Sequence, residues 1–301
     1  MGFDELRALL ARHVRDDATT DIAGLHIARA DRAGPPTTSM SGTVLAVLAQ
    51  GAKRLALGDR LYEYRPGTYF VASVDLPVTG HFTEIGPDHP ALGLALVLEP
   101  TAIAELLLRA GPGDLPRPAP AAPPGIAVGE MSPELLDALI RLVRLLERPR
   151  DRGVLAPMVI REILWRLITA DQGGVVRQLG LADSSLSHIA RAVRWIREHY
   201  AEPFRVEDLA RRTGMSPSAF YRNFQAVAAM SPIQFQKQIR LQEARLLLAA
   251  HPHDITGVGH RVGYDSPSQF SREYRRRFGV PPSQDAAHLH GRAGTAATAL
   301  P

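Results

Sequence analysis

Two sets of polar side chains in this 301-residue chain stand at the spacing that places groups on one face of a helix. Both sets occupy positions i, i+3, i+4 and i+7; they are Ser218, Tyr221, Arg222 and Gln225, and then Ser268, Ser271, Arg272 and Arg275. Hydroxyl and guanidinium groups in such a row can donate hydrogen bonds to phosphates and to the acceptor edge of guanine in a major groove. An ordinary solvated helix face is the alternative for either set alone, and the repetition of the same chemistry disfavours it.

Each set lies in one copy of a repeated pattern that predicts two helices joined by a tight turn. The copies read VEDLARRTGMSPSAFYRNF over residues 206–224 and ITGVGHRVGYDSPSQFSREY over residues 255–274. Gly214 and Gly263 suit the left-handed position at the end of a helix. Ser216 and Ser266, each followed by proline, suit the N-cap of the next helix. A buried stripe is predicted opposite each polar set, and it consists of Phe220, Phe224, Phe270, Tyr274 and Phe278.

The segment between the copies, residues 232–250, has the apolar spacing of one packed helix. At about 1.5 Å per residue it spans roughly 28 Å, which is close to the roughly 34 Å between successive major-groove segments on one side of a duplex. One chain is therefore expected to set two recognition helices into adjacent groove segments. Lys237 and Arg240 of the connecting helix are expected to contact phosphates. Such contacts carry no base information, so both residues should strengthen binding to every DNA sequence alike.

These residues resemble the AraC/XylS family of bacterial transcription regulators. The resemblance rests on Leu209-Ala210, Gly214-Met215-Ser216, Phe220, Arg222, Phe224, Gly263-Tyr264, Ser266, Phe270, Arg272 and the Phe278-Gly279-Val280-Pro281-Pro282 ending. It implies two helix-turn-helix subdomains joined by a long helix within residues 184–285, which bind double-stranded DNA as a unit and reach base edges with Arg222 and Arg272. The full set of expected DNA-binding residues is Ser216, Ser218, Tyr221, Arg222, Gln225, Lys237, Arg240, Ser266, Ser268, Gln269, Ser271, Arg272 and Arg275.

The charge distribution points to the same region. The formal net charge is +4 at pH 7, and residues 185–285 hold fifteen Lys or Arg against nine Asp or Glu, whereas the rest of the chain holds twenty against twenty-two. A basic surplus confined to one region is typical of a nucleic-acid-binding segment. Arginine makes up 33 of the 35 basic residues, so bidentate contacts to phosphate or guanine are available.

The N-terminal part of the chain has the pattern of short strands. Residues 3–14 predict an amphipathic helix, and from residue 24 to residue 98 apolar runs alternate with Gly, Pro and Asp. Many strands with few helices predict a barrel or a double-sheet sandwich. Gly51 and the Gly58-Asp59 pair are interpreted as hairpin turns.

This region resembles the cupin-like N-terminal sensor domain of one AraC subfamily, on its Gln50-Gly51-x-Lys53 and Asp75-Leu76-Pro77 elements. The resemblance spans residues 19–108 and implies a jelly-roll β-barrel whose interior takes a small organic effector. Strand alternation must turn some of the candidate lining residues outward; the candidates are Tyr62, Tyr64, Tyr69, Phe70 and His81. A filled barrel that only mediates dimerisation is the alternative.

A cupin-type enzyme with a DNA-binding tail is the second functional class. Cupin enzymes hold a metal through a closely spaced His-x-His, a Glu and a distant His. His26, His81 and His89 lack that spacing, and His288-Leu289-His290 lies beyond the DNA-binding region, so no metal or cofactor is expected. A third class, a DNA-repair fusion, needs an acceptor cysteine. The chain has no cysteine, which also excludes disulfides and thiolate metal sites.

A helical hairpin is expected at about residues 132–171, after a proline-rich loop over residues 111–125. It begins at the N-cap residue Ser132, and it completes a sensor or dimerisation domain over residues 1–180. The apolar stripe of its first helix is broad enough to pack on the barrel and on a second subunit, and packing within one subunit only is the alternative. The stripe consists of Leu135, Leu139, Leu142, Val143 and Leu146.

The chain is therefore expected to be an α+β protein of two domains, a cupin-like β-barrel with a helical hairpin and an all-α domain. Residues 286–301, rich in Ala, Gly and His, are expected to be disordered. Nothing in the sequence resembles a signal peptide or a transmembrane segment, so a cytoplasmic protein without membrane contact is expected. A homodimer and contact with RNA polymerase stay open.

Overall fold

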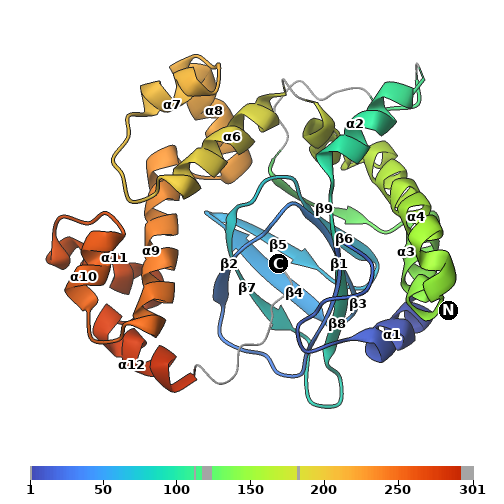
Figure 1. Cartoon of the computed structure of the whole chain (residues 1–301), viewed down its shortest axis with the longest axis horizontal. Coiled ribbons are helices and arrows are strands. Elements are labelled where there is room, and N and C mark those ends of the chain that lie inside the picture. Colours follow the sequence, from blue (N-terminus) through green and yellow to red (C-terminus); the bar gives the residue numbers. More distant parts are fainter. Residues whose placement is uncertain (1, 112, 117–123, 182–183, 293–301) are drawn as a thin grey trace. The chain divides into compact units, whose positions relative to one another are not determined.

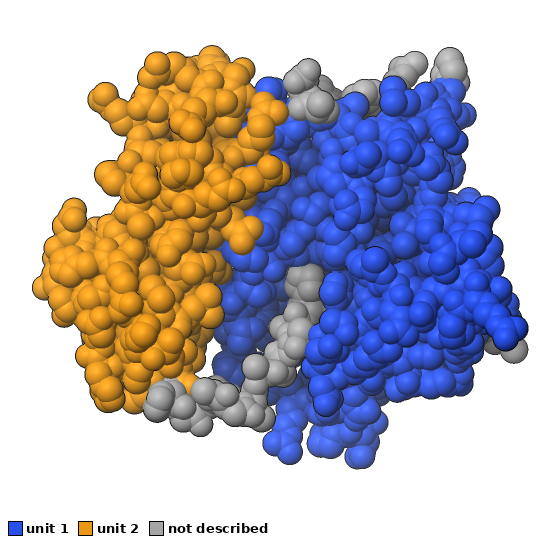
Figure 2. All heavy atoms as spheres, viewed as in Figure 1, with its two compact units in different colours: residues 1–190, 226–229, 298–301 blue, residues 191–225, 230–297 orange. Residues whose placement is uncertain are grey.

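The structure, a computed structural model, describes every residue except 1, 112, 117–123, 182–183 and 293–301 (Figure 1). The described chain divides into two compact units (Figure 2). The first contains the residues up to Ala190 together with Ala226–Ala229, and the second contains Arg191–Gln225 and the residues from Met230 onward. Strands lie in the first unit and the second is helical, as the sequence predicts.

The strands of the first unit form two antiparallel sheets. In spatial order, the first sheet contains β1 (Leu25–Ala30), β8 (Ala91–Val97), β3 (Val44–Gln50), β6 (Thr68–Ala72) and β9 (Ile126–Glu130). The second contains β2 (Thr37–Met40), β7 (Pro77–Thr83), β4 (Ala52–Leu57) and β5 (Arg60–Tyr64). Tyr64 of the second sheet stacks on Phe70 of the first with ring centroids 5.3 Å apart, so the two sheets pack face to face. The strand-rich domain is therefore confirmed, in its double-sheet form.

Two glycines that look alike in the sequence have different roles between strands. Leu57 pairs with Arg60, so Gly58-Asp59 is a two-residue hairpin loop as predicted. The hairpin predicted at Gly51 is wrong, because β3 before it belongs to the first sheet and β4 after it to the second. Gly51 has a φ of +80°, and an added Cβ would lie 2.8 Å from Ile85, so glycine is required where the chain crosses between sheets.

Helices cover one face of the first sheet. They are α1 (Gly2–His13), α2 (Pro100–Arg109), α3 (Pro133–Arg144), α4 (Pro149–Thr169) and α5 (Gly173–Arg177), with 3₁₀ turns at Leu145–Glu147 and Gln178–Gly180. Ser132 accepts a hydrogen bond from the backbone N–H of Leu135 at 3.2 Å, which confirms the predicted N-cap. Leu45 of β3, Leu139 of α3 and Leu164 of α4 share one buried apolar core. The predicted helical hairpin is thus α3 and α4, whereas α2 and β9 were not predicted.

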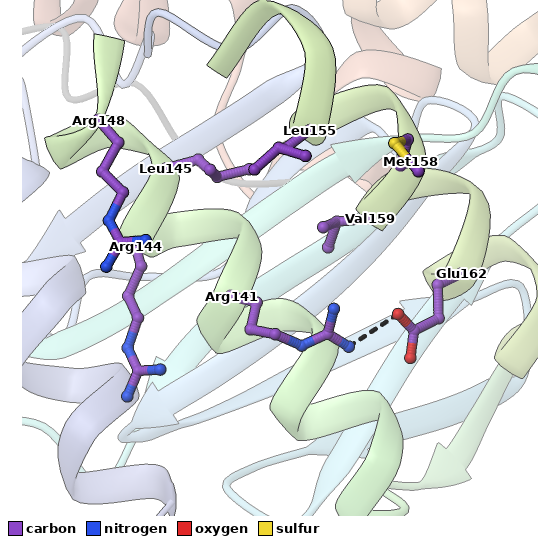
Figure 3. Close-up of a pocket in the computed structure, with 8 residues that line it drawn as sticks. All are labelled: Arg141, Arg144, Leu145, Arg148, Leu155, Met158, Val159 and Glu162. Carbon is purple, nitrogen blue, oxygen red and sulfur yellow. Dashed lines mark hydrogen bonds and ion pairs between the residues drawn. The ribbon is translucent and has the colours of Figure 1, made fainter. Parts of the chain in front are cut away.

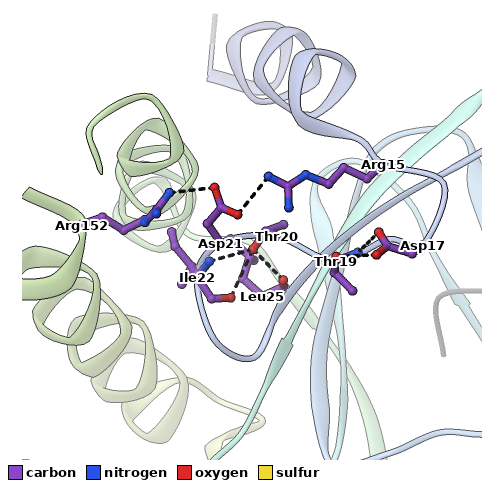
Figure 4. Close-up of polar contacts among 8 residues, drawn as sticks. All are labelled: Arg15, Asp17, Thr19, Thr20, Asp21, Ile22, Leu25 and Arg152. Carbon is purple, nitrogen blue, oxygen red and sulfur yellow. Dashed lines mark hydrogen bonds and ion pairs between the residues drawn. The ribbon is translucent and has the colours of Figure 1, made fainter. Parts of the chain in front are cut away.

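A polar cluster ties α4 to the segment that follows α1 (Figure 4). The Asp21 carboxylate accepts hydrogen bonds from Arg15 at 3.0 Å and from Arg152 of α4 at 3.0 Å. The hydrogen bond from Arg15 is the main cause of the lowered pKa of Asp21. The Thr20 hydroxyl donates to the carbonyl oxygen of Leu25 at 2.8 Å, which fixes the chain as it enters β1.

The second unit contains the repeated helix pairs. Its helices are α6 (Ser185–Glu198, which begins in the first unit), α7 (Val206–Arg212), α8 (Pro217–Ala228, whose last three residues are assigned to the first unit), α9 (Pro232–Ala250), α10 (Ile255–Arg261), α11 (Pro267–Phe278) and α12 (Pro282–Arg292). Gly214 and Gly263 have φ values of +77° and +90°, so both short helices end in the left-handed conformation that favours glycine, as predicted. The predicted aromatic stripe is buried, apart from a partly exposed Phe278, and Phe224 packs on Phe235 of α9 with ring centroids 5.7 Å apart.

The structure corrects the expected disordered tail. Residues 286–292 belong to α12, and Ala286 is fully buried. The helix packs on α9 because Asp285 accepts a hydrogen bond from the Tyr274 hydroxyl at 2.8 Å and forms an ion pair with Arg245 at 2.9 Å. The prediction is therefore wrong for residues 286–292, and the remainder of the expected tail, residues 293–301, lies outside the described residues.

Candidate nucleic-acid interface

The two polar sets lie on the outer faces of α8 and α11. Ser218, Tyr221, Arg222 and Gln225 are exposed on α8, opposite the buried rings of Phe220 and Phe224. Ser268, Arg272 and Arg275 are exposed and Ser271 is partly exposed on α11, opposite Phe270 and Tyr274. The structure thus brings together on each helix the face that the sequence predicts.

One exposed arginine of α11, Arg276, is absent from the set of DNA-binding residues predicted from the sequence. Arg276 lies one helical turn beyond Arg272, so the two guanidinium groups extend one row. The signal was in the sequence, because position i+8 shares the face of positions i and i+4. Within the described residues, the guanidinium groups of Arg222, Arg272, Arg275 and Arg276 form no hydrogen bond or ion pair. These four cations are therefore available to an anionic partner.

Ser216 and Ser266 cap the two recognition helices. The Ser266 hydroxyl oxygen accepts from the backbone N–H of Gln269 at 3.3 Å, and the Ser216 hydroxyl oxygen accepts from that of Ala219 at 3.4 Å. A capping serine uses its oxygen as the acceptor and keeps its own proton for donation. Both hydroxyls can therefore cap a helix and donate to a phosphate at the same time.

Glu273, which faces α9 from α11, holds three side chains of the second copy. Its carboxylate accepts from Lys237 at 2.8 Å, from the Tyr264 hydroxyl at 2.9 Å and from Gln269 at 3.2 Å. Burial raises the pKa of Glu273, but these hydrogen bonds more than offset it and leave the pKa below its ordinary value. Lys237 and Gln269, both predicted to contact DNA, are thus already engaged within the unit.

Arg240 has a structural role that the sequence prediction did not foresee. Its guanidinium donates to the carbonyl oxygens of Tyr200 at 2.7 Å, Gly263 at 2.6 Å and Ala201 at 3.1 Å. Burial lowers its pKa. The predicted phosphate contact of Arg240 is therefore replaced by a link from α9 to the segment between α6 and α7 and to the turn between α10 and α11, because its donors point at backbone carbonyls.

The strand register sorts the predicted effector-lining residues by face. Residues opposite each other in a ladder share a face, and Lys53 pairs with Tyr64 while Leu55 pairs with Tyr62. Since Lys53, Leu55 and Tyr64 are buried, Tyr62 and Tyr64 face the space between the sheets. Phe70, which stacks on Tyr64, faces it from the first sheet.

Tyr69 and His81 lie elsewhere. Tyr69 belongs to the core beneath the helices, and its ring would meet a Cβ added at Gly129 at 2.4 Å. His81 pairs with Arg54 on the outer face of the second sheet, where Arg54 donates to Glu63 at 2.8 Å. Both lining predictions are corrected, because adjacent residues of a strand point to opposite sides and the sequence alone does not fix the register.

A groove lies between α3 and α4 on the surface of the first unit (Figure 3). It is lined by Arg141, Arg144, Leu145, Arg148, Leu155, Met158, Val159 and Glu162. Arg141 donates to Glu162 across it at 2.7 Å, and Met158 is 64% exposed. The apolar stripe predicted to serve both the barrel and a second subunit is buried within the unit except for Leu146, which is partly buried, so α4 provides the exposed apolar side chains of this groove.

The described residues contain neither a membrane-spanning helix nor a cluster of metal ligands. No helix among them is both long enough and apolar enough to cross a bilayer. No three His, Asp or Glu side chains among them converge as metal ligands, and His288 lies exposed on α12.

Comparison with known proteins identifies both regions. The family model described as the AraC-type transcriptional regulator N-terminus matches residues 21–175, and a helix-turn-helix domain model matches residues 209–287. The virulence regulon transcriptional activator VirF of Yersinia enterocolitica is 30% identical over 54% of this chain and 60% of its own length. The HTH-type transcriptional regulator ExsA of Pseudomonas aeruginosa is 30% identical over 54% of this chain and 57% of its own. The chain thus matches about 60% of the length of these relatives.

A solved structure shares the arrangement of elements at low sequence identity. ToxT of Vibrio cholerae, crystallised with an unsaturated fatty acid bound, has a TM-score of 0.53 at 11% identity, over 90% of this chain and 96% of ToxT. An apo form of a ToxT variant gives a TM-score of 0.52 at 10% identity. At such identities the likeness concerns the fold alone.

Proposed function

Because this chain belongs to the family of AraC-type transcriptional regulators, we propose that it binds specific double-stranded DNA sites through α8 and α11 under the control of a small organic effector. The observation that carries the proposal is the repeated exposed face on these two helices, with four arginines whose guanidinium groups form no hydrogen bond or ion pair among the described residues. Guanidinium groups on a helix of this kind suit bidentate contacts with guanine. The control of DNA binding by an effector is proposed from the regulatory role of the family.

The residues divide by role. Arg222 and Arg272 lie at the centre of their faces and read bases, while the hydroxyls of Ser216, Ser218, Ser266, Ser268 and Ser271 donate to phosphates. Tyr221, 50% exposed, offers a ring edge and a hydroxyl beside Arg222. Gln225, Arg275 and Arg276 extend the two faces toward the helix ends. Lys237 and Gln269 contribute by orienting α11 through Glu273 rather than by direct contact.

The effector belongs to the space between the two sheets of the first unit. Tyr62, Tyr64 and Phe70 face that space, and aromatic walls with few polar groups suit a small organic molecule. ToxT holds an unsaturated fatty acid on the same fold, which supports ligand control of this fold. A ligand changes DNA affinity only if it binds two arrangements of the chain unequally. A domain that only mediates dimerisation, through the groove between α3 and α4, is the competing function.

The enzyme alternative has a direct test. A cupin-type enzyme with a DNA-binding tail would need a bound metal, so metal analysis of the purified full-length chain separates it from a regulator. A stoichiometric transition metal would favour the enzyme. We place the protein in the cytoplasm, because its DNA target lies there, and we leave a homodimer and RNA polymerase as partners to be sought by cross-linking on DNA.

The DNA-reading proposal is tested by selecting binding sites from a randomised duplex library with the full chain. Arg222→Ala and Arg272→Ala should each relax the selected sequence in a different half of the site, at a cost of about 1–3 kcal/mol per lost bidentate contact. Arg211→Ala is the matched control, since Arg211 is an exposed arginine of α7 that pairs with Asp208. Selected sites that are identical for all three variants and the unaltered chain would overturn the docking of α8 and α11.

A further inference from the structure

The outer face of α8 carries an exposed aromatic side chain, Tyr221. It is 50% exposed, whereas every other aromatic side chain among the described residues is buried or partly buried. Within the described part of the chain, its ring makes no contact with another ring and its hydroxyl forms no hydrogen bond. A tyrosine combines an apolar ring with a polar tip, and such side chains are enriched at interfaces. Tyr221 is therefore available to a partner that offers an apolar group.

The second copy lacks this ring. Both recognition helices bury an aromatic stripe of the same spacing, which fixes how their exposed faces correspond. In that alignment Arg222 corresponds to Arg272, and the residue before the arginine is Tyr221 in α8 and Ser271 in α11. Serine has a short hydroxyl where tyrosine has a wide ring. The two helices thus differ directly beside an arginine that they share.

The position of Tyr221 along α8 suits a contact with a base. A recognition helix contacts base edges with its N-terminal residues. Helix α8 begins at Pro217, so Tyr221 lies in its second turn, one residue before Arg222. Both side chains lie on the exposed face. If Arg222 reads a guanine, the ring of Tyr221 lies beside a neighbouring base pair.

The major groove offers one apolar group that a ring can recognise. All base pairs present hydrogen-bond donors and acceptors there, and among the four ordinary bases thymine adds a C5-methyl group. The tyrosine ring itself has no donor or acceptor, since its polar chemistry is confined to the hydroxyl. A hydroxyl contact with a phosphate would carry no base information, whereas a contact of the ring with the methyl group would distinguish bases.

We propose that the ring of Tyr221 packs on the C5-methyl group of a pyrimidine beside the base pair read by Arg222. The half-site of α8 therefore requires a methyl group that the half-site of α11, with Ser271 at the corresponding place, does not. Thymine meets this requirement, and so does 5-methylcytosine, which carries the methyl group on the same carbon. The assignment rests on the proposed docking of α8 and α11 on DNA and names the chemical group that α8 reads.

The test uses the full-length chain and duplexes that carry its selected site, in which the half-site of α8 is the one that Arg222→Ala relaxes. Replacing each thymine of that half-site by deoxyuridine removes only a methyl group. At one position this change should weaken binding about fourfold, the factor that corresponds to burying one methyl group. At the same position, 5-methylcytosine paired with guanine should bind about fourfold more tightly than cytosine does.

Variants assign the effect to the ring. Tyr221→Ser should bind the thymine and deoxyuridine duplexes equally, and Tyr221→Phe should keep the difference, because the ring and not the hydroxyl makes the contact. Tyr221 is exposed, so neither change should lower the melting temperature of the chain. Ser271→Tyr should make the corresponding position of the α11 half-site select thymine.

The outcomes separate the methyl contact from DNA reading itself. If no thymine in the half-site of α8 is sensitive to deoxyuridine, the methyl contact is overturned and the proposed reading of DNA by α8 and α11 stands. A difference that persists in Tyr221→Ser, or that disappears in Tyr221→Phe, overturns it in the same way. A chain that selects no sequence from the library contradicts the proposed function, and the methyl contact with it.

Discussion

The two helix-turn-helix copies share one fold but differ in how their second helices are held. In the first copy, α8 packs through Phe220 and Phe224, whose ring centroids lie 5.6 Å apart. In the second, α11 is also held by two carboxylates, the partly buried Glu273 on the helix itself and the buried Asp285 on α12. Among the described residues, aromatic packing of the second helix is therefore supplemented by carboxylates in the second copy and not in the first.

The difference follows from the charge of the helices. Helix α8 has one arginine and no acidic residue, whereas α11 has four arginines and Glu273. Four cations on three turns repel one another. The carboxylates of Glu273 and Asp285 fix the helix against this repulsion through ion pairs with Lys237 and Arg245 of α9. We infer that α11 supplies more of the electrostatic attraction to phosphates, and that α8 relies more on Tyr221 and Gln225.

The largest expected effect comes from removing the charge on Asp285. Its side chain is 6% exposed and its partner Arg245 is 34% exposed, so Asp285→Asn leaves a partly buried cation without its carboxylate. The loss should be about 2–3 kcal/mol of unfolding free energy, below the range for a fully buried pair because Arg245 is partly hydrated. Hydrogen exchange of the full chain should show lost protection in α11 and α12 and unchanged protection in α8.

Asp208→Asn in the first copy is the control for that prediction. Asp208 pairs with Arg211 on the surface of α7, with both side chains more than half exposed. Its loss should change stability by about 1 kcal/mol or less. Equal losses for the two variants would show that the buried carboxylate of the second copy stabilises the chain no more than a surface ion pair does.

An intermediate effect is expected at Arg240. Arg240→Lys keeps the charge but cannot donate to three carbonyls in the same geometry, so it should destabilise the chain by about 1.5–3 kcal/mol, almost as much as Arg240→Met. Neither change should alter the salt dependence of DNA binding at a temperature where the chain is folded. A salt slope reduced by about one in Arg240→Met, and restored in Arg240→Lys, would instead reveal a phosphate contact.

Local signals predicted much of the second unit. Gly214 and Gly263 mark helix ends because a positive φ depends on the residue itself, and the Phe220–Phe224 spacing follows from the period of one helix. Helix α12 lacked such a signal. Its first turn is fixed by Asp285, whose partners Tyr274 and Arg245 lie on other helices, so composition alone indicated disorder.

Non-local pairing explains the errors in the first unit. Gly51 and Gly58 both have positive φ, but only strand pairing shows that one joins two sheets and the other closes a hairpin. His81 faces outward because it pairs with Arg54, and a shift of one residue would have turned it inward. The sequence singles out Lys53 only as part of the Gln50-Gly51-x-Lys53 element. Its burial was not predicted, because it depends on the same strand register.

The smallest expected effects concern the capping serines, and they test whether both copies meet DNA in the same way. Ser216→Ala and Ser266→Ala should each cost about 1 kcal/mol of stability, because each hydroxyl oxygen accepts from a first-turn N–H. Asp is as good an N-cap as Ser and suits the positive end of the helix dipole. Ser216→Asp and Ser266→Asp should therefore leave the unfolding midpoint unchanged.

DNA affinity then separates capping from contact. A carboxylate at the start of a recognition helix has no proton to donate and repels a phosphate, so both Asp variants should bind DNA more weakly than the unaltered chain while they remain equally stable. Similar losses for Ser216→Asp and Ser266→Asp would mean that both helix N-termini approach the DNA backbone. If one Asp variant binds as tightly as the unaltered chain, that serine only caps its helix, and the two copies do not dock alike.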